Sequence, residues 1–175
     1  MPRVFSFIAW SGTGKTTYLE RLIAALKAKG LRVAAVKHDA HRFELDREGK
    51  DSRRFADAGA DVVAIADGGK CAVMEYRPVR LAELLARLPE VDLILVEGWH
   101  EEAGNPILLH RAATGQPPKL PPADCLAVVS DTELDTGGRP CFPLDDPEPL
   151  SEFLLAQIEA AGRRTGGAAE NAIRF

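Results

Sequence analysis

The chain has 175 residues, of which 46% are apolar, and its formal charge is −4 at neutral pH. This length and apolar content predict one compact domain and exclude a largely disordered chain. There is no block of basic residues and no apolar run near the roughly 18 residues that cross a membrane, so we expect neither nucleic acid nor a membrane as a partner.

The cysteines and the first residues of the chain indicate in which cellular compartment the protein is found. Cys71, Cys125 and Cys141 are far apart and form no CxxC pair, which favours ordinary thiols over a disulfide frame or a metal site. A strand-like segment follows Met1 and Pro2 directly, without the pattern of a signal peptide. We therefore expect a cytoplasmic protein.

The first 36 residues predict a strand, a helix and a second strand. Residues 3–9 form a short apolar run, residues 16–29 carry leucines and an isoleucine at helical spacing before Gly30, and residues 31–36 are again apolar. Two strands joined through a helix are parallel in one sheet, so this unit predicts a parallel α/β arrangement.

The rest of the chain continues the alternation of helices and strands. Predicted helices span residues 51–58, 81–88 and 150–160, and predicted strands span residues 61–66, 71–76, 91–96 and 125–129. The strands at 61–66 and 71–76 flank the turn Asp67-Gly68-Gly69 and should form a hairpin. Residues 115–122 hold four prolines and predict an extended surface loop. We expect one domain over residues 1–161 and a mobile tail over residues 162–175.

Residues 9–17 read A-W-S-G-T-G-K-T-T and match the P-loop pattern G-x-x-x-x-G-K-[ST] except at Ala9. Gly12 and Gly14 let successive backbone N–H groups turn toward phosphate oxygens, Lys15 supplies a cation, and the Thr16 hydroxyl can bind magnesium. The residues expected to bind nucleotide phosphates are Ser11, Gly12, Thr13, Gly14, Lys15, Thr16 and Thr17. The motif predicts the three-layer α/β/α fold of P-loop NTPases, with a mostly parallel sheet and the hairpin as an extension.

Carboxylates at the ends of neighbouring strands complete the predicted magnesium site. Glu97 ends the apolar segment at residues 91–96, whereas Asp92 starts it and should be a surface charge at the opposite sheet edge. Asp39 follows the second strand and can orient a water near the γ-phosphate. The candidate catalytic residues are Lys15, Asp39 and Glu97, and Thr16 with Glu97 is the candidate metal pair. A capping or solvated role remains the alternative for both Glu97 and Asp39.

Residues 37–53 are dense in ionisable groups. Composition favours a solvated loop, or a mobile loop that closes over nucleotide and brings Lys50 and Arg53 to phosphate. His38 and His41 form a weak candidate metal pair.

Three segments of this chain resemble the molybdopterin-guanine dinucleotide biosynthesis adaptor (MobB) family. They are residues 10–17, residues 36–60 with K-H-D at 37–39 and G-K-D-S at 49–52, and residues 92–98. The resemblance implies a dimeric P-loop protein that binds GTP and Mg²⁺, hydrolyses GTP slowly and assists the guanylyltransferase (MobA-like) that joins GMP to molybdopterin. It implies that Thr16 and Glu97 serve magnesium, and it leaves open whether molybdopterin itself is bound.

The residues alone do not decide between GTP and ATP. The chain has no Asn-Lys-x-Asp guanine motif, but Asp131 follows the strand at residues 125–129 and can accept the guanine N1 and N2 hydrogens. A plain turn aspartate is the alternative. A small-molecule kinase with lid arginines at Arg42, Arg47, Arg53 and Arg54, a metallocentre-insertion GTPase and a binding module without turnover also stay open.

Overall fold

The computed structural model describes residues 3–39, 43, 46–99, 102 and 104–169, without side chains for 162–169. The chain divides into two compact units. We call Met1–His38 with Leu88–Phe175 the sheet unit, and Asp39–Arg87 the hairpin unit. The single domain over residues 1–161 stays a prediction.

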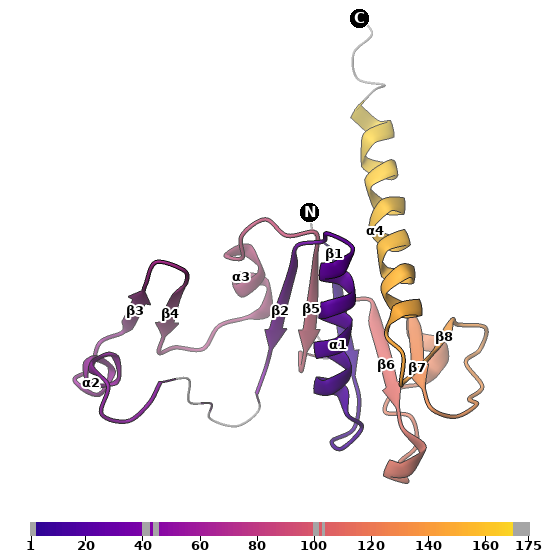
Figure 1. The fold of residues 1–175 in the computed structure, drawn as a ribbon, viewed down its shortest axis with the longest axis horizontal. Helices are drawn as coiled ribbons and strands as arrows, with labels where there is room; N and C mark the ends of the chain where they lie inside the picture. The colour runs from indigo at the N-terminus through magenta and orange to yellow at the C-terminus, as the bar shows by residue number, and fades with distance from the viewer. Residues whose placement is uncertain (1–2, 40–42, 44–45, 100–101, 103, 170–175) are drawn as a thin grey trace, which may run out of the picture. The chain divides into compact units, whose positions relative to one another are not determined.

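The sheet unit is built on six parallel strands in the order β2-β5-β1-β6-β7-β8 (Figure 1). Their bounds are β1 Arg3–Ile8, β2 Val33–Lys37, β5 Leu93–Glu97, β6 Pro106–His110, β7 Ala127–Ser130 and β8 Cys141–Pro143. The first two strands are parallel, as predicted, but β5 lies between them. The chain leaves β1 toward β2 on one side, and β6 lies on the other, so the end of β1 faces the reversal of strand order where α/β proteins bind ligands.

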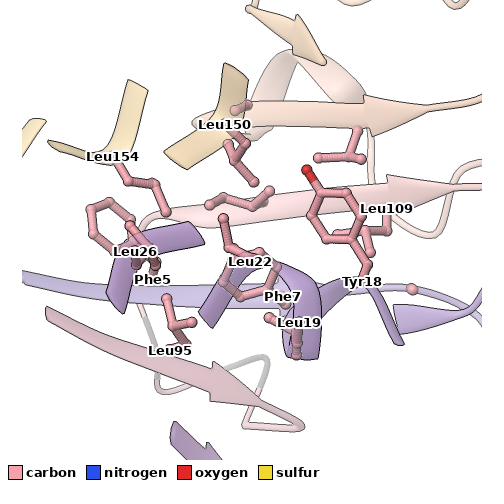
Figure 2. Close-up of a cluster of buried hydrophobic side chains, with 14 of the residues drawn as sticks. Phe5, Phe7, Tyr18, Leu19, Leu22, Leu26, Leu95, Leu109, Leu150 and Leu154 are labelled. Atoms are coloured by element: carbon pink, nitrogen blue, oxygen red, sulfur yellow. The ribbon is translucent and has the colours of Figure 1, made fainter. Parts of the chain in front are cut away.

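Helices α1 (Lys15–Ala28) and α4 (Glu148–Ala169) pack against one face of this sheet. Figure 2 shows leucines of both helices directed at strand residues, with Leu22 and Leu26 from α1 near Phe5 and Phe7 of β1. Phe5 and Phe7 share a face because side chains alternate along a strand. Complete burial of each leucine contributes roughly 1.5–3 kcal/mol, so the apolar face of α1 fixes the helix that follows the P-loop.

The hairpin unit holds α2 (Asp51–Asp57), α3 (Leu81–Ala86) and the antiparallel pair β3 (Val62–Ala66) and β4 (Cys71–Glu75). Asp67 shapes the turn, because its Oδ1 accepts the N–H groups of Gly69 at 2.7 Å and Lys70 at 2.9 Å. The predicted hairpin, and with it the predicted α/β fold with a parallel sheet, is confirmed.

Two strands and part of a helix were not predicted. β6 contains only three consecutive apolar residues, Ile107 to Leu109, and β8 is three residues long, so neither shows a periodicity of its own. Their neighbours in the sheet supply the pairing that the local sequence does not indicate. Helix α4 runs to Ala169, past the predicted end at residue 160, and residues 170–175 lie outside the described residues.

The proline-rich segment that starts at residue 115 forms a loop, as its sequence predicts. Residues 115–121 contain no helix or strand and lie between two short 3-10 helices, η1 (Ala112–Thr114) and η2 (Pro122–Asp124). In the described part of the chain, no helix has both the length and the apolar character needed to cross a membrane.

Candidate nucleotide-binding site

The P-loop joins β1 to α1 and turns sharply at its glycines, and within it the Thr13 N–H donates to the Trp10 carbonyl at 3.4 Å. Gly12 and Gly14 adopt φ of +81° and +87°, the left-handed region that glycine reaches without strain. Gly14 is the N-cap of α1, and the first turn has neither a side-chain cap nor an acidic residue. Thr16 and Thr17 in that turn are exposed. An uncapped helix start attracts negative charge through its free N–H groups and its dipole.

Lys15 and Glu97 form an ion pair beside this loop. Lys15 Nζ lies 2.7 Å from Glu97 Oε1, and their side chains are only 18% and 14% exposed. Glu97 ends β5 and lies in register with Phe7 of β1, so the structure brings it to the edge where the P-loop starts. Thr16 follows Lys15 on α1. A hydroxyl and a carboxylate are hard oxygen donors of the kind that Mg²⁺ prefers, so this donor set fits the predicted ion.

Asp92 lies at the other end of β5, as predicted. Its Oδ2 accepts the backbone N–H of Arg32 at 2.6 Å, and its own N–H bonds the Arg32 carbonyl at 2.8 Å. This carboxylate fixes the loop before β2, at the sheet edge opposite to the P-loop.

Gly98 permits a close approach between the ends of β2 and β5. It adopts φ of +109°, and a Cβ built on it would lie 2.6 Å from the His38 carbonyl oxygen. The His38 N–H donates to the Glu97 carbonyl at 2.7 Å, and its ring lies 4.5 Å from the ring of Trp99. His38 therefore packs beside Glu97, the predicted magnesium ligand. Its predicted metal partner, His41, lies outside the described residues, and those that are described hold no cluster of three His, Cys, Asp or Glu suited to a metal.

The structure does not place the remaining charged candidates at the P-loop. Asp39 and Lys50 belong to the hairpin unit, whose position relative to the P-loop is not defined, so the catalytic role of Asp39 stays a prediction. Arg53 and Arg54 pair with Asp57 and Asp51 on their own helix, at 2.9 and 3.4 Å. Arg42 lies outside the described residues.

Asp131 lies beside a hollow at the carboxyl ends of β7 and β8. The hollow has a volume of about 820 Å³, and its lining includes Ser130, Asp131, Thr132, Cys141, Pro143 and Asp145. Asp131 Oδ1 accepts the N–H of Ala112 at 2.8 Å, and Oδ2 lies 4.0 Å from Arg111 Nη1. The volume is within the range of ligand pockets, so a nucleobase fits this place by size.

Desolvation raises the pKa of two cysteine thiols near this region. It raises the pKa of the Cys125 thiol, which is fully buried, and the pKa of Cys141 in the lining of the hollow. The cysteines in the structure are free thiols, consistent with the expectation of ordinary cysteines. Both thiols stay protonated at neutral pH and are poor nucleophiles.

The segment after β6 contacts the P-loop, which sequence reasoning missed. We call residues 111–119 the strap. Arg111 Nε donates to the Thr13 carbonyl at 2.8 Å, and Lys119 Nζ donates to the Ala9 carbonyl at 3.3 Å. Trp10 Nε1 donates in return to the Pro117 carbonyl at 2.8 Å. The apolar residues Ile107 to Leu109, with Arg111 shortly after them, could have indicated this contact. It was not predicted from the sequence because β6 was not recognised as a strand.

Comparison with known proteins settles the family. The family model described as MobB, molybdopterin guanine dinucleotide synthesis protein B, matches residues 4–131. The chain belongs to the MobB family. All three segments that carry the resemblance in sequence lie within the matched range.

MobB proteins from several bacteria are similar to this chain over most of its length. The molybdopterin-guanine dinucleotide biosynthesis adapter protein of Escherichia coli K12 is 37% identical over 164 residues, which cover 89% of this chain and 93% of that protein. The protein of the same name from Haemophilus influenzae is 41% identical over 151 residues, 83% of each chain. The crystal structure of Bacillus subtilis MobB superposes with a TM-score of 0.71 at 28% identity, covering 90% of this chain and 98% of that one.

Gly98→Ala tests the close approach beside Glu97. A methyl group there meets the His38 carbonyl and the left-handed φ disfavours alanine, so we expect a loss of about 1–3 kcal/mol in the free energy of unfolding, measured in urea. Gly104→Ala is the matched control, since its Cβ would have open space within 4 Å. Equal unfolding curves for the two variants would contradict this role of Gly98.

Proposed function

We propose that this MobB-family chain binds GTP with Mg²⁺ at its P-loop and acts as an adapter protein in the synthesis of molybdopterin guanine dinucleotide. It hydrolyses GTP slowly at most, and it assists the guanylyltransferase of that pathway in the cytoplasm. The observation that carries the proposal is the Lys15–Glu97 pair at the mouth of an uncapped P-loop. The adapter role is supported by the names of relatives that this chain matches over most of their length.

The ion pair suggests how the site changes when nucleotide binds. A triphosphate offers Lys15 a stronger anionic partner than a single carboxylate, so the ammonium group moves to the β- and γ-phosphates. Glu97 is then released to hold magnesium together with the Thr16 hydroxyl, and the bound ion neutralises phosphate charge. The N–H groups of the P-loop and of the first turn of α1 bind the remaining phosphate oxygens.

Slow hydrolysis follows from what the site supplies. Lys15 and the magnesium ligands stabilise charge on the phosphates, but a fast NTPase also needs a positioned water and an arginine at the γ-phosphate. We assign the water-orienting role to Asp39, which follows β2 in sequence. An adapter that must stay loaded with GTP has no need of rapid turnover.

Guanine recognition is assigned to Asp131. Asp131 lines the hollow and its Oδ1 already accepts the Ala112 N–H, so we assign the base hydrogens to Oδ2. Adenine presents no N1 hydrogen and no 2-amino group, and so offers this carboxylate no matching donors. Hydrogen bonds to a charged group contribute about 1.5–3 kcal/mol, enough for at least tenfold discrimination.

Calorimetric titration with GTP and with ATP, each with magnesium, tests the proposal. We expect GTP to bind at least tenfold more tightly, a difference of about 1.4 kcal/mol. Lys15→Ala should abolish binding of both, and Asp131→Asn should reduce the GTP affinity toward that of ATP. Equal affinities in the unaltered protein, or a preference for ATP, would reject the GTP adapter and favour a small-molecule kinase.

Replacing Glu97 by glutamine tests the magnesium site. Glu97→Gln keeps the shape and removes the charge, so we expect the magnesium concentration needed for half-maximal GTP binding to rise about tenfold. Asp92→Asn is the matched control, because it removes a carboxylate from the opposite end of the same strand. An unchanged magnesium dependence in Glu97→Gln would remove Glu97 from the metal site.

We further propose that the chain forms a homodimer through its hairpin. Val62 and Val73 lie on one face of the β3–β4 pair and are 54% and 63% exposed. In the hairpin, β3 and β4 pair only with one another, so each has an outer edge that another strand can join. An exposed apolar face with open edges favours a second copy of the same hairpin.

Sedimentation velocity of Val73→Glu tests the dimer. A carboxylate on the apolar face must be desolvated in the contact, so we expect a shift from dimer to monomer at micromolar concentration. Ile65→Glu places the same charge on the opposite face of the hairpin and serves as the control, because Ile65 is also more than half exposed. A monomeric unaltered protein, or a dimer that survives Val73→Glu, would contradict this surface.

A further inference from the structure

Three peptide carbonyls of the P-loop are held by hydrogen bonds from specific side chains. Arg111 Nε donates to the Thr13 oxygen at 2.8 Å, and Lys119 Nζ donates to the Ala9 oxygen at 3.3 Å. The Thr13 hydroxyl, which is buried, donates to the Trp10 oxygen at 2.8 Å. Two of the three donors are cations of the strap, and these two hold the first and last peptide groups of the loop.

A held carbonyl determines where the N–H of the same peptide group points. The peptide unit is planar and trans, so its C=O and N–H point in opposite directions. Fixing the Thr13 oxygen toward Arg111 therefore directs the Gly14 N–H away from the strap. In the same way, Lys119 directs the Trp10 N–H, and the Thr13 hydroxyl directs the Ser11 N–H.

The sheet order shows what lies on the other side of the loop. β1 is flanked by β6, which leads into the strap, and by β5, which ends at Glu97. The Lys15–Glu97 pair lies at the end of β5, on the other side of β1 from the strap. That side carries the phosphate and magnesium groups of the proposed function.

The positive charge of the two holders adds to their geometric effect. A cation at a carbonyl oxygen draws electron density from the peptide group and makes its N–H a stronger donor. The Arg111 guanidinium lies so close to Gly14 that a Cβ built there would be 3.2 Å from its Nη2, and its Nη1 lies 4.0 Å from Asp131 Oδ2. The Lys119 ammonium lies 5.1 Å from the centre of the Trp10 ring, within range of a cation–π contact.

We propose that Arg111 and Lys119 are positioning residues, which set the phosphate-binding peptide groups of the P-loop through hydrogen bonds to their carbonyl oxygens. The proposal rests on the proposed function in so far as the ligand is a polyphosphate. It assigns to the strap the preorganisation that oxyanion-binding sites need.

Titration with magnesium and inorganic triphosphate tests the proposal, since this probe has phosphates but no base or ribose. We expect Arg111→Ala to weaken binding by about tenfold or more and Lys119→Ala by a few-fold, because its hydrogen bond is longer. Arg111→Lys keeps the charge near Thr13 and should restore most of the affinity.

The matched control is Arg139→Ala. Arg139 Nε donates to the Ala123 carbonyl at 2.8 Å, the same type of contact in the same unit, but not to the P-loop. It should leave triphosphate affinity within twofold of the unaltered protein. Equal affinities for Arg111→Ala and Arg139→Ala would overturn the proposal.

A second measurement needs no ligand. In amide ¹H–¹⁵N spectra of the free protein, Arg111→Ala should shift the Gly14 amide and Lys119→Ala the Trp10 amide, while Arg139→Ala leaves both in place. Unmoved Gly14 and Trp10 signals would reject the positioning role. If the unaltered protein fails to bind triphosphate but these shifts occur, the phosphate ligand is wrong and the positioning role stands.

Discussion

The direction of the peptide groups between β1 and α1 is the constraint on which the site depends. Left-handed φ values at Gly12 and Gly14 allow the chain to turn without a Cβ clash, and the buried leucines of α1 fix the helix that follows. Neither feature by itself decides which way the peptide planes between them face. Hydrogen bonds from the Thr13 hydroxyl and from the strap determine these directions. The two strap residues lie 98 and 110 positions after the loop residues that they contact.

Two opposite charges at the same sheet edge neutralise each other in the free chain. Lys15 is mostly buried, and a buried ammonium group without a partner is costly. Glu97 provides the partner and is itself a predicted ligand of the metal ion. Under the proposed function, the two charges that separate when a nucleotide and its cation bind are the two that neutralise each other in the free chain, and each obtains a new partner of opposite sign.

The sequence predicted the parts of this site whose signal is local. The structure places Lys15 and Thr16 at the start of a helix and Glu97 at the end of a strand, as predicted, because the motif and the apolar run at residues 91–96 are contiguous patterns. Their roles toward phosphate and magnesium stay predictions. Arg111 and Lys119 were missed because their role depends on β6, whose three apolar residues become a strand only between β1 and β7. Asp39 follows a correctly predicted strand, but sequence and structure alike leave open how the hairpin unit is placed.

Asp131 links the two ends of the proposed nucleotide site. Its Oδ1 accepts the N–H of Ala112, the first residue of η1, and its Oδ2 lies 4.0 Å from Arg111 Nη1. Arg111 in turn donates to the Thr13 carbonyl of the P-loop. The Arg111 guanidinium therefore lies between the carboxylate that we assign to the base and the carbonyl whose peptide group we assign to phosphate. Under the proposed function, a change at one of these two groups reaches the other through a single side chain, which is the physical basis on which base and phosphate binding can be coupled.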